Sequence, residues 1–174
     1  RNLFKEQFQD GFSQVDITLE RLSELVEELR QVIDGYKKSM NSAATKAISA
    51  IEDLGLSPED FSGKSRGPAN TFYKIRDKEE FELTNTFLLT AKGEKSWYAK
   101  KAEKADLIEE AIQGKFGVAI DQLIECVEKN EKGYRTALAL FRNIYAFGLL
   151  EALNSNLKAY RDEQNIMLIS DNNA

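Results

Sequence analysis

The sequence feature that most constrains the fold is a long apolar stripe in residues 15–54, a stretch without proline. Its apolar side chains recur at alternating steps of four and three residues, the period of one face of an α-helix. They are Val15, Leu19, Leu22, Val26, Leu29, Val32, Ile33, Tyr36, Met40, Ala43, Ala44, Ala47, Ile51 and Leu54. The stripe predicts one helix, about 60 Å long at 1.5 Å per residue, with a C-cap at Gly55. Gly35, Asn41 and Ser42 are the positions at which it could kink or divide.

A second long helix is predicted over residues 134–160, where apolar side chains again recur at steps of three or four. They are Tyr134, Leu138, Phe141, Tyr145, Leu149, Leu153, Leu157 and Tyr160. Residues 116–127 predict a separate amphipathic helix that ends near Asn130–Gly133. Gly114 and Gly117 predict a break before that helix.

Shorter elements are predicted between the two long helices. Residues 56–71 contain both prolines of the chain and predict a connector. Within it, a turn of helix at Pro58–Phe61 is expected to insert apolar side chains into the core. The mixed apolar spacing of residues 72–91 predicts short helices. Residues 95–113 predict one further helix, with Trp97 among its inward-facing residues.

Together these elements predict an all-α fold, an elongated bundle built on two long helices that pack antiparallel or nearly so. Only residues 165–170 form a short apolar run that could be a strand or the start of another helix. The chain starts at Arg1 and stops in the polar run Asp171–Ala174. We therefore expect residues 1–174 to be a single helical subdomain from a longer chain, with residues 1–14 as its entry segment.

The composition excludes several kinds of site. The chain has no histidine, which excludes Ser-His-Asp and Cys-His nucleophile systems and histidine-containing zinc or di-iron sites. The one cysteine, Cys126, lies among apolar residues, so we expect a buried helical thiol in a protein of the reducing cytoplasm. The paired carboxylates Glu27-Glu28, Glu79-Glu80 and Glu109-Glu110 lie in charge-rich helical sequence typical of a solvated face. No catalytic residue, metal ligand or membrane span emerges.

Gly63-Lys64-Ser65 resembles the end of a phosphate-binding P-loop, but its context does not fit. The motif needs a glycine five positions before Gly63, where this chain has Pro58, and a strand leading into the loop. The approach through Ser57 and Pro58 is instead typical of a helix start. We therefore expect an ordinary polar loop and no cofactor-binding residues here.

The charge is distributed unevenly along the chain. Residues 63–104 contain ten basic and six acidic residues, a net charge of +4, although the whole chain carries −5. Lysines that contact phosphates gain affinity by releasing counterions, and an exposed aromatic ring can stack on an unpaired base. The candidate nucleic-acid-binding residues are Lys92, Lys95, Trp97, Tyr98, Lys100, Lys101 and Lys104. The alternative interpretation is that Trp97 belongs to the core and that the lysines form a solvated face.

The end of the chain resembles a segment of superfamily 1 DNA helicases. A predicted helix ends in Lys158-Ala159-Tyr160-Arg161-Asp162-Glu163-Gln164-Asn165, and Ile166-Met167-Leu168-Ile169-Ser170-Asp171 follows. This order is similar to the segment before the DEAD-like magnesium motif of UvrD/Rep-type helicases, especially the RecB/AddA-like helicase-nucleases. Ile169 and Ser170 stand where that family has Phe and Asp-type residues. RNLFKEQF at the N-terminus and LGLSPEDFSG in the connector are similar to helical insertions of Bacteroidetes-type members.

The resemblance implies a helical subdomain inserted in the first RecA-like motor domain of such a helicase, with residues 166–174 starting the return to the motor core. It implies that ATP and Mg²⁺ bind elsewhere in the parent chain, and that this piece does not hydrolyse ATP. The expected partners are DNA, bound weakly and with strong salt dependence, and the remaining motor domains. The expected function is that of a non-catalytic accessory subdomain in DNA repair or recombination. The alternative is a free-standing helical scaffold or adaptor that binds protein partners; a small all-α enzyme is a third and weaker one.

Overall fold

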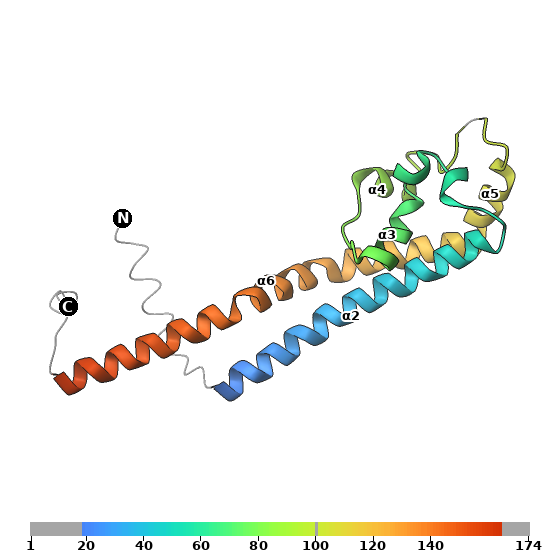
Figure 1. The fold of residues 1–174 in the computed structure, drawn as a ribbon. Coiled ribbons are helices and arrows are strands. Elements are labelled where there is room, and N and C mark those ends of the chain that lie inside the picture. Colours follow the sequence, from blue (N-terminus) through green and yellow to red (C-terminus); the bar gives the residue numbers. More distant parts are fainter. Residues whose placement is uncertain (1–18, 100, 165–174) are drawn as a thin grey trace. The chain divides into compact units, whose positions relative to one another are not determined.

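The computed structural model describes residues 19–99 and 101–164, and every regular element in these two ranges is helical (Figure 1). The long helices are α2, Leu19–Glu52, and α6, Lys115–Gln164. Between them lie the 3-10 helices η1, Pro58–Asp60, and η2, Lys64–Arg66, and the helices α3, Asn70–Lys78, α4, Asn85–Ala91, and α5, Ala105–Gln113. The predicted all-α fold with two long helices is confirmed.

The contacts divide the chain into two compact units. One, here called the core unit, is Val32–Arg135, and the other, the terminal unit, is Arg1–Gln31 together with Thr136–Ala174. Both α2 and α6 contribute to each unit, because the boundaries fall inside these helices. Residues 1–18 and 165–174 lie outside the described ranges, so the entry segment, the apolar run 165–170 and the return segment 166–174 remain predictions.

In the core unit, α2 packs antiparallel to α6. The rings of Tyr36 and Tyr134 stack with centroids 4.3 Å apart. Further along, Lys46 Nζ donates to Gln122 Oε1 at 3.0 Å, so α2 advances as α6 returns. Here α2 presents a face of small and flexible buried side chains that lets its neighbours approach closely. They are Met40, Ala43, Ala44, Ala47, Ile48 and Ile51.

An aromatic cluster fills the space between the short helices and the long pair. Trp97 lies at its centre, with ring centroids 5.2–6.4 Å from those of Phe61, Phe72, Phe87 and Phe116. Three of these four contacts are edge-to-face or tilted, the geometry that aromatic quadrupoles prefer. Phe61 enters the cluster from the end of η1, as the predicted turn of helix requires.

Two predicted boundaries are wrong. The helix predicted over residues 95–113 begins only at Ala105, since residues 92–104 form a loop. The break predicted at Asn130–Gly133 does not occur, because α6 runs through it. A helical glycine costs about 1 kcal/mol relative to alanine, which the packing of α6 against α2 readily offsets. The break before α6 falls at Gly114 alone.

In the terminal unit, the described parts of α2 and α6 also run antiparallel. The Arg30 guanidinium lies 5.7 Å from the centroid of the Phe141 ring. Eight residues earlier on α2, the Leu22 side chain lies against Gly148, so that a methyl group built there would be 3.0 Å from Leu22 Cδ1. The buried apolar side chains described in this unit are Leu29, Ala137 and Ile144.

Candidate nucleic-acid interface

The candidate lysines lie on the loop of residues 92–104, which connects α4 to α5. Lys92, Lys95 and Lys101 are exposed, and no ion pair involves them among the residues that the structure describes. Lys100 lies outside the described residues. This loop therefore presents three cations to solvent, next to the acidic side chains of Glu94 and Glu103, which are also exposed.

The loop is held in place at its start and in its middle. At its start, the Lys92 amide donates to the Leu88 carbonyl at 3.0 Å, and Gly93 turns the chain with φ of 78°, a left-handed conformation that favours glycine. In the middle, the Ser62 amide donates to the Trp97 carbonyl at 2.7 Å. The loop backbone is thus fixed next to the connector, while the side chains of Lys92, Lys95 and Lys101 are exposed.

The structure places Trp97 in the core, where 6% of its surface is exposed. A ring packed among four phenylalanines cannot stack on a nucleic-acid base unless the core opens, so the candidate role of Trp97 as a base-stacking residue does not fit its position. The alternative interpretation of Trp97 as a core residue is the one that the structure supports. Its role in the loop is to anchor the backbone between Lys95 and Lys101.

Tyr98 is half-buried, and its hydroxyl donates to the carboxylate of Glu109 on α5. This hydrogen bond is the main reason that the pKa of Tyr98 lies above its ordinary value, with a smaller effect from burial and from nearby carboxylates. The hydroxyl therefore stays protonated and tied to α5. Of the two aromatic candidates on this loop, only Tyr98 has a ring that is partly exposed and could stack on a base.

Lys104 has a structural role that the sequence did not suggest. Its Nζ donates to the Gly55 carbonyl at 3.0 Å and to the Asp60 carboxylate at 3.1 Å. The Ser57 amide and hydroxyl also donate to Asp60, at 2.9 and 3.0 Å. Partial burial alone would raise the pKa of Asp60, but these hydrogen bonds outweigh it and hold that pKa below its ordinary value. Lys104 therefore fastens the connector to the start of α5.

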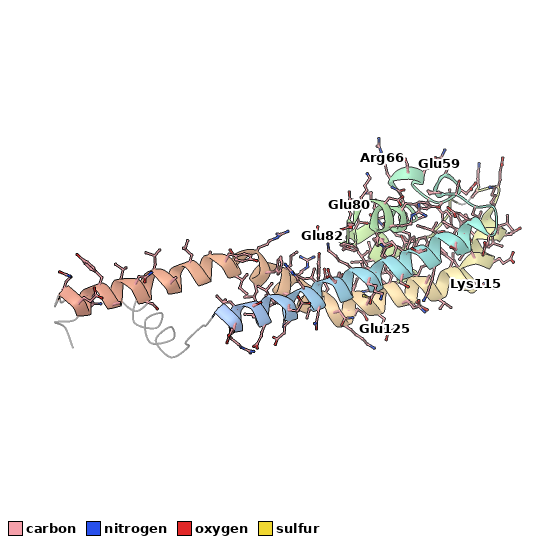
Figure 2. All side chains as sticks on the ribbon, turned by 60° about the horizontal axis from the view of Figure 1, so that its bottom comes forward. Glu59, Arg66, Glu80, Glu82, Lys115 and Glu125 are labelled. Atoms are coloured by element: carbon pink, nitrogen blue, oxygen red, sulfur yellow. The ribbon has the colours of Figure 1, made fainter. Side chains whose placement is uncertain are left out.

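The connector adds two exposed cations that the sequence analysis did not list as candidates. Lys64 and Arg66 belong to η2, and Lys64 lies two residues from Ser62, whose amide bonds to the candidate loop. Arg66 and the acidic Glu59 both project on the side of the core unit that carries the short helices (Figure 2). We call Lys64, Arg66, Lys92, Lys95 and Lys101 the basic surface. The hydrogen bond from the Ser62 amide to the Trp97 carbonyl joins the two segments that carry these cations, and no local sequence pattern predicts it.

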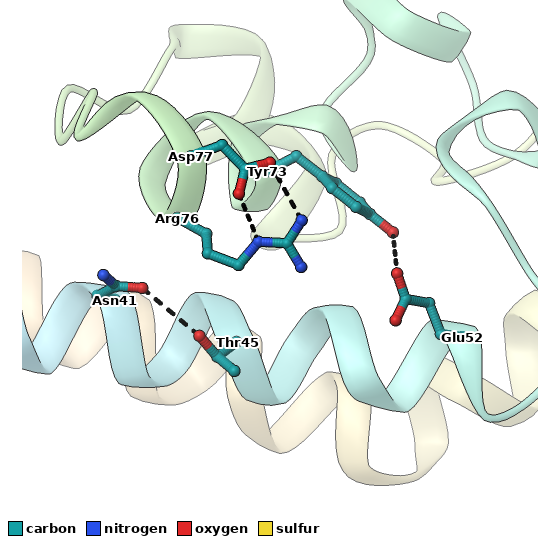
Figure 3. Close-up of polar contacts among 6 residues, drawn as sticks. All are labelled: Asn41, Thr45, Glu52, Tyr73, Arg76 and Asp77. Atoms are coloured by element: carbon teal, nitrogen blue, oxygen red, sulfur yellow. Dashed lines mark hydrogen bonds and ion pairs between the residues drawn. The ribbon is translucent and has the colours of Figure 1, made fainter.

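Arg76 of α3 is engaged in contacts of its own. Arg76 pairs with Asp77, with Nε 2.6 Å from Oδ1, and its guanidinium lies 5.1 Å from the Tyr73 ring centroid (Figure 3). The Tyr73 hydroxyl donates to Glu52 Oε1 at 3.2 Å, and burial together with this carboxylate raises the pKa of Tyr73 to about 12. These contacts tie α3 to the end of α2. They make Arg76 a poor candidate for a phosphate contact.

Several other kinds of site find no support in residues 19–99 and 101–164. These ranges hold no cluster of three or more Cys, Asp or Glu residues that could bind a metal ion. The Cys126 thiol is buried, as predicted, and burial raises its pKa, so little of the reactive thiolate forms at neutral pH. Gly63-Lys64-Ser65 forms the start of the three-residue helix η2. No helix in the described part of the chain is long and apolar enough to cross a membrane.

The chain was compared with protein-family models, with curated proteins and with solved structures, and none of the three comparisons found a match. The function is therefore inferred from the residues and the geometry of the basic surface.

Proposed function

We propose that this chain is a non-catalytic helical accessory subdomain of an ATP-dependent DNA helicase of the UvrD/Rep type, working in DNA repair or recombination in the cytoplasm. Its basic surface contacts the DNA backbone beside the motor. The observation that supports this is the set of three exposed lysines, without an ion-pair partner among the described residues, on a loop anchored by a buried tryptophan. ATP and Mg²⁺ would be bound by the motor domains of the parent chain.

The chemistry of the basic surface fits phosphates better than bases. Lysine is a flexible point charge that attracts any phosphate group and does not discriminate between bases. Since Trp97 is buried, base stacking would depend on the half-buried Tyr98 ring alone. The proposed contact is therefore independent of sequence, weak in the isolated subdomain, and screened by salt.

The test is a titration of fluorescently labelled forked DNA, followed by anisotropy over a series of salt concentrations. We expect the variant Lys95→Gln/Lys101→Gln to bind more weakly than wild type. Each lost duplex phosphate contact lowers the slope of log K against log salt by about 0.9, and each single-strand contact by about 0.7. The variant should therefore flatten that slope by about 1.4 to 1.8.

The matched control is Lys38→Gln/Lys115→Gln, which removes the same charge from exposed positions on α2 and α6 that form no ion pair among the described residues. Circular dichroism checks that both variants keep the helical content of wild type. Equal loss of affinity in the two variants would show a general charge effect and contradict the proposed surface. Equal affinity of the Lys95/Lys101 variant and wild type would contradict it as well.

A second candidate function, a helical scaffold that binds a protein partner, is favoured by a groove between α2 and α6 in the core unit. The groove has a volume of about 380 Å³ and is lined mainly by apolar surface, including Ala50, Val118 and Ala119. Val118 is 57% exposed, as expected for a side chain that a partner helix could cover. The coding sequence after Ala174 separates the two functions. An Asp-Glu pair of the Walker B type downstream supports the helicase, and a stop codon near Ala174 supports the scaffold.

A further inference from the structure

The terminal unit carries an apolar stripe on α6 that no described residue covers. Its side chains are spaced by four, four, four and three residues, and each is at least half exposed. They are Tyr145, Leu149, Leu153, Leu157 and Tyr160, here called the α6 stripe, with exposed fractions of 72%, 65%, 50%, 55% and 55%. Large contiguous apolar surfaces of this kind mark interaction sites.

The α6 stripe lies on a different face of the helix from the one that packs against α2. The α2-facing residues of this unit include Ile144, which is buried, and Gly148, which Leu22 touches. At about 100° per residue, the stripe spans about 120° of the helix, and its middle lies about 140° away from these two residues. The packing of α2 against α6 therefore leaves the stripe open to a further partner.

The residues of the stripe and its ends form a nearly palindromic pattern. Arg142 and Glu163 flank it at opposite ends, both exposed and both on the same face of α6 as the stripe. Among the large apolar and charged side chains of this face, the order read in either direction is charge, Tyr, Leu, Leu, Leu, Tyr and charge, centred on Leu153, while Ala146 and Asn156 lie on the same face outside this pattern. A two-fold axis through Leu153 would place Tyr145 opposite Tyr160, Leu149 opposite Leu157, and Arg142 opposite Glu163. Such self-complementarity is what an isologous interface between identical chains requires.

We propose that the occupant of the α6 stripe is a second copy of this chain, whose α6 packs antiparallel across a two-fold axis at Leu153. Leucines form the apolar centre, the tyrosines place their rings at the edges of the contact, and two Arg142–Glu163 pairs close its ends. Because of the two-fold symmetry, each Arg142 faces the Glu163 of the other chain, once at each end of the contact. This pairing of opposite charges favours the antiparallel register. In a parallel pair, Arg142 would face Arg142 and the charges would repel.

The first experiment measures the mass of the chain in solution by analytical ultracentrifugation over a range of concentrations. We expect a reversible dimer for wild type and a monomer for Leu153→Glu, since two carboxylates would then face each other at the centre. Leu107→Glu is the matched control, because Leu107 is an exposed leucine of α5 outside the stripe, 37% exposed. A wild-type chain that stays monomeric at all concentrations overturns the proposal, as does a dimer that Leu153→Glu leaves intact.

Charge exchange tests the register with variants of two exposed residues, whose helical content is checked against wild type by circular dichroism. Arg142→Glu alone and Glu163→Arg alone should each raise the dimer dissociation constant about five- to tenfold at low salt, because like charges then face each other. An equimolar mixture of the two variants should associate about as tightly as wild type, because each end of the heterodimer then brings one acidic and one basic side chain together, and the double variant Arg142→Glu/Glu163→Arg should likewise return the dissociation constant to the wild-type value. If the double variant is weaker than both single variants, the antiparallel register is wrong.

Disulfide trapping distinguishes a second copy from a segment of the same chain. In a Cys126→Ala background, Leu153→Cys should form a cross-link between two chains under mild oxidation. Tyr145→Cys alone should cross-link poorly, since its partner position is Tyr160, and a mixture of Tyr145→Cys and Tyr160→Cys chains should cross-link well. A stripe covered instead by residues 1–18 of the same chain would keep Leu153→Cys monomeric and unlinked, and that result overturns the proposal.

Discussion

At the scale of single residues, Lys104 shows how a charged side chain can be misassigned from sequence. It belongs to a lysine-rich stretch and was a candidate for DNA contact. In the structure its amino group is shared between the Gly55 carbonyl and Asp60. A hydrogen bond to a carbonyl 49 residues away fixes where the connector and α5 meet. Charge pattern alone cannot distinguish such a lysine from the freely solvated Lys101 three positions earlier.

The depressed pKa of Asp60 predicts a pH-dependent contribution to stability. Because the folded state holds this carboxylate in its ionised form, its contribution is present above the pKa of an unfolded aspartate, about 3.9, and is lost as the pH falls through the lower folded value. We expect Asp60→Asn to lower the free energy of unfolding by about 1 kcal/mol at pH 7, a modest figure because Lys104 is partly exposed. Urea unfolding at several pH values measures the difference from wild type.

That difference should shrink below pH about 4, since wild-type Asp60 is then protonated in the unfolded state and increasingly in the folded state. Asp34→Asn is the matched control, because Asp34 is exposed on α2. A destabilisation by Asp60→Asn that stays constant down to the lowest pH measured would indicate lost packing rather than a lost charge.

At the scale of elements, the sequence predicted the helices better than their ends. The stripe of residues 15–54 predicts a helix well because Met40, Ala44, Ala47 and Ile51 recur at helical spacing and are all buried. Asn41, a suspected kink, instead accepts a hydrogen bond from Thr45 within an unbroken helix (Figure 3). The false break at Gly133 has the same cause, since tertiary packing overrides local propensity. Local rules could not place the loop of residues 92–104, because Trp97 is held there by rings from other elements.

Two glycines of α6 should respond oppositely to the same substitution. A methyl group on Gly117 would lie 2.0 Å from the Ile112 carbonyl oxygen, where the last turn of α5 meets α6. We expect Gly117→Ala to lower the free energy of unfolding by about 2 kcal/mol or more, because backbone must move. Gly133 is exposed, with nothing within 4 Å of the same position, so Gly133→Ala should stabilise the chain by about 0.5 to 1 kcal/mol. Thermal and urea unfolding measure the change in the free energy of unfolding for each variant. If both variants were stabilised or both destabilised, the assigned backbone contact at Gly117 would be contradicted.

At the scale of the whole molecule, the two units differ in how much apolar surface they bury. The continuous core cluster, from Tyr36 to Cys126, lies entirely in the core unit. The terminal unit buries Leu29, Ala137 and Ile144 among its described residues and exposes the α6 stripe. Local opening therefore costs less free energy in the terminal unit than in the core unit.

Hydrogen exchange of backbone amides should report this difference. At a protein concentration low enough to keep the chain monomeric, we expect amides of residues 149–164 to exchange about 100-fold faster than amides of residues 119–127, although all belong to one helix. Mass spectrometry of peptic peptides measures both segments in the same sample. Uniform exchange along α6 would show that the helix opens as a single unit and would contradict this prediction.

The candidate site was only partly predictable from sequence. The net positive charge of residues 63–104 predicted the candidate region, and the structure shows that Lys92, Lys95 and Lys101 are exposed in it. Lys64 and Arg66 were added to the candidate site because the Ser62 amide donates a hydrogen bond to the Trp97 carbonyl. This contact spans 35 positions of the sequence, and no periodic pattern predicts it. The helical spacing placed Trp97 among inward-facing residues, but Trp97 lies outside the helix and is buried by rings from other elements.

The same burial gives the chain an internal optical reporter. Trp97 is the only tryptophan, so its emission comes from a single, dry position in the middle of the phenylalanine cluster. The emission spectrum of the unlabelled protein thus reports whether this cluster of the core unit is closed. Tryptophan emission can therefore follow the integrity of the core unit while residues of the terminal unit are substituted.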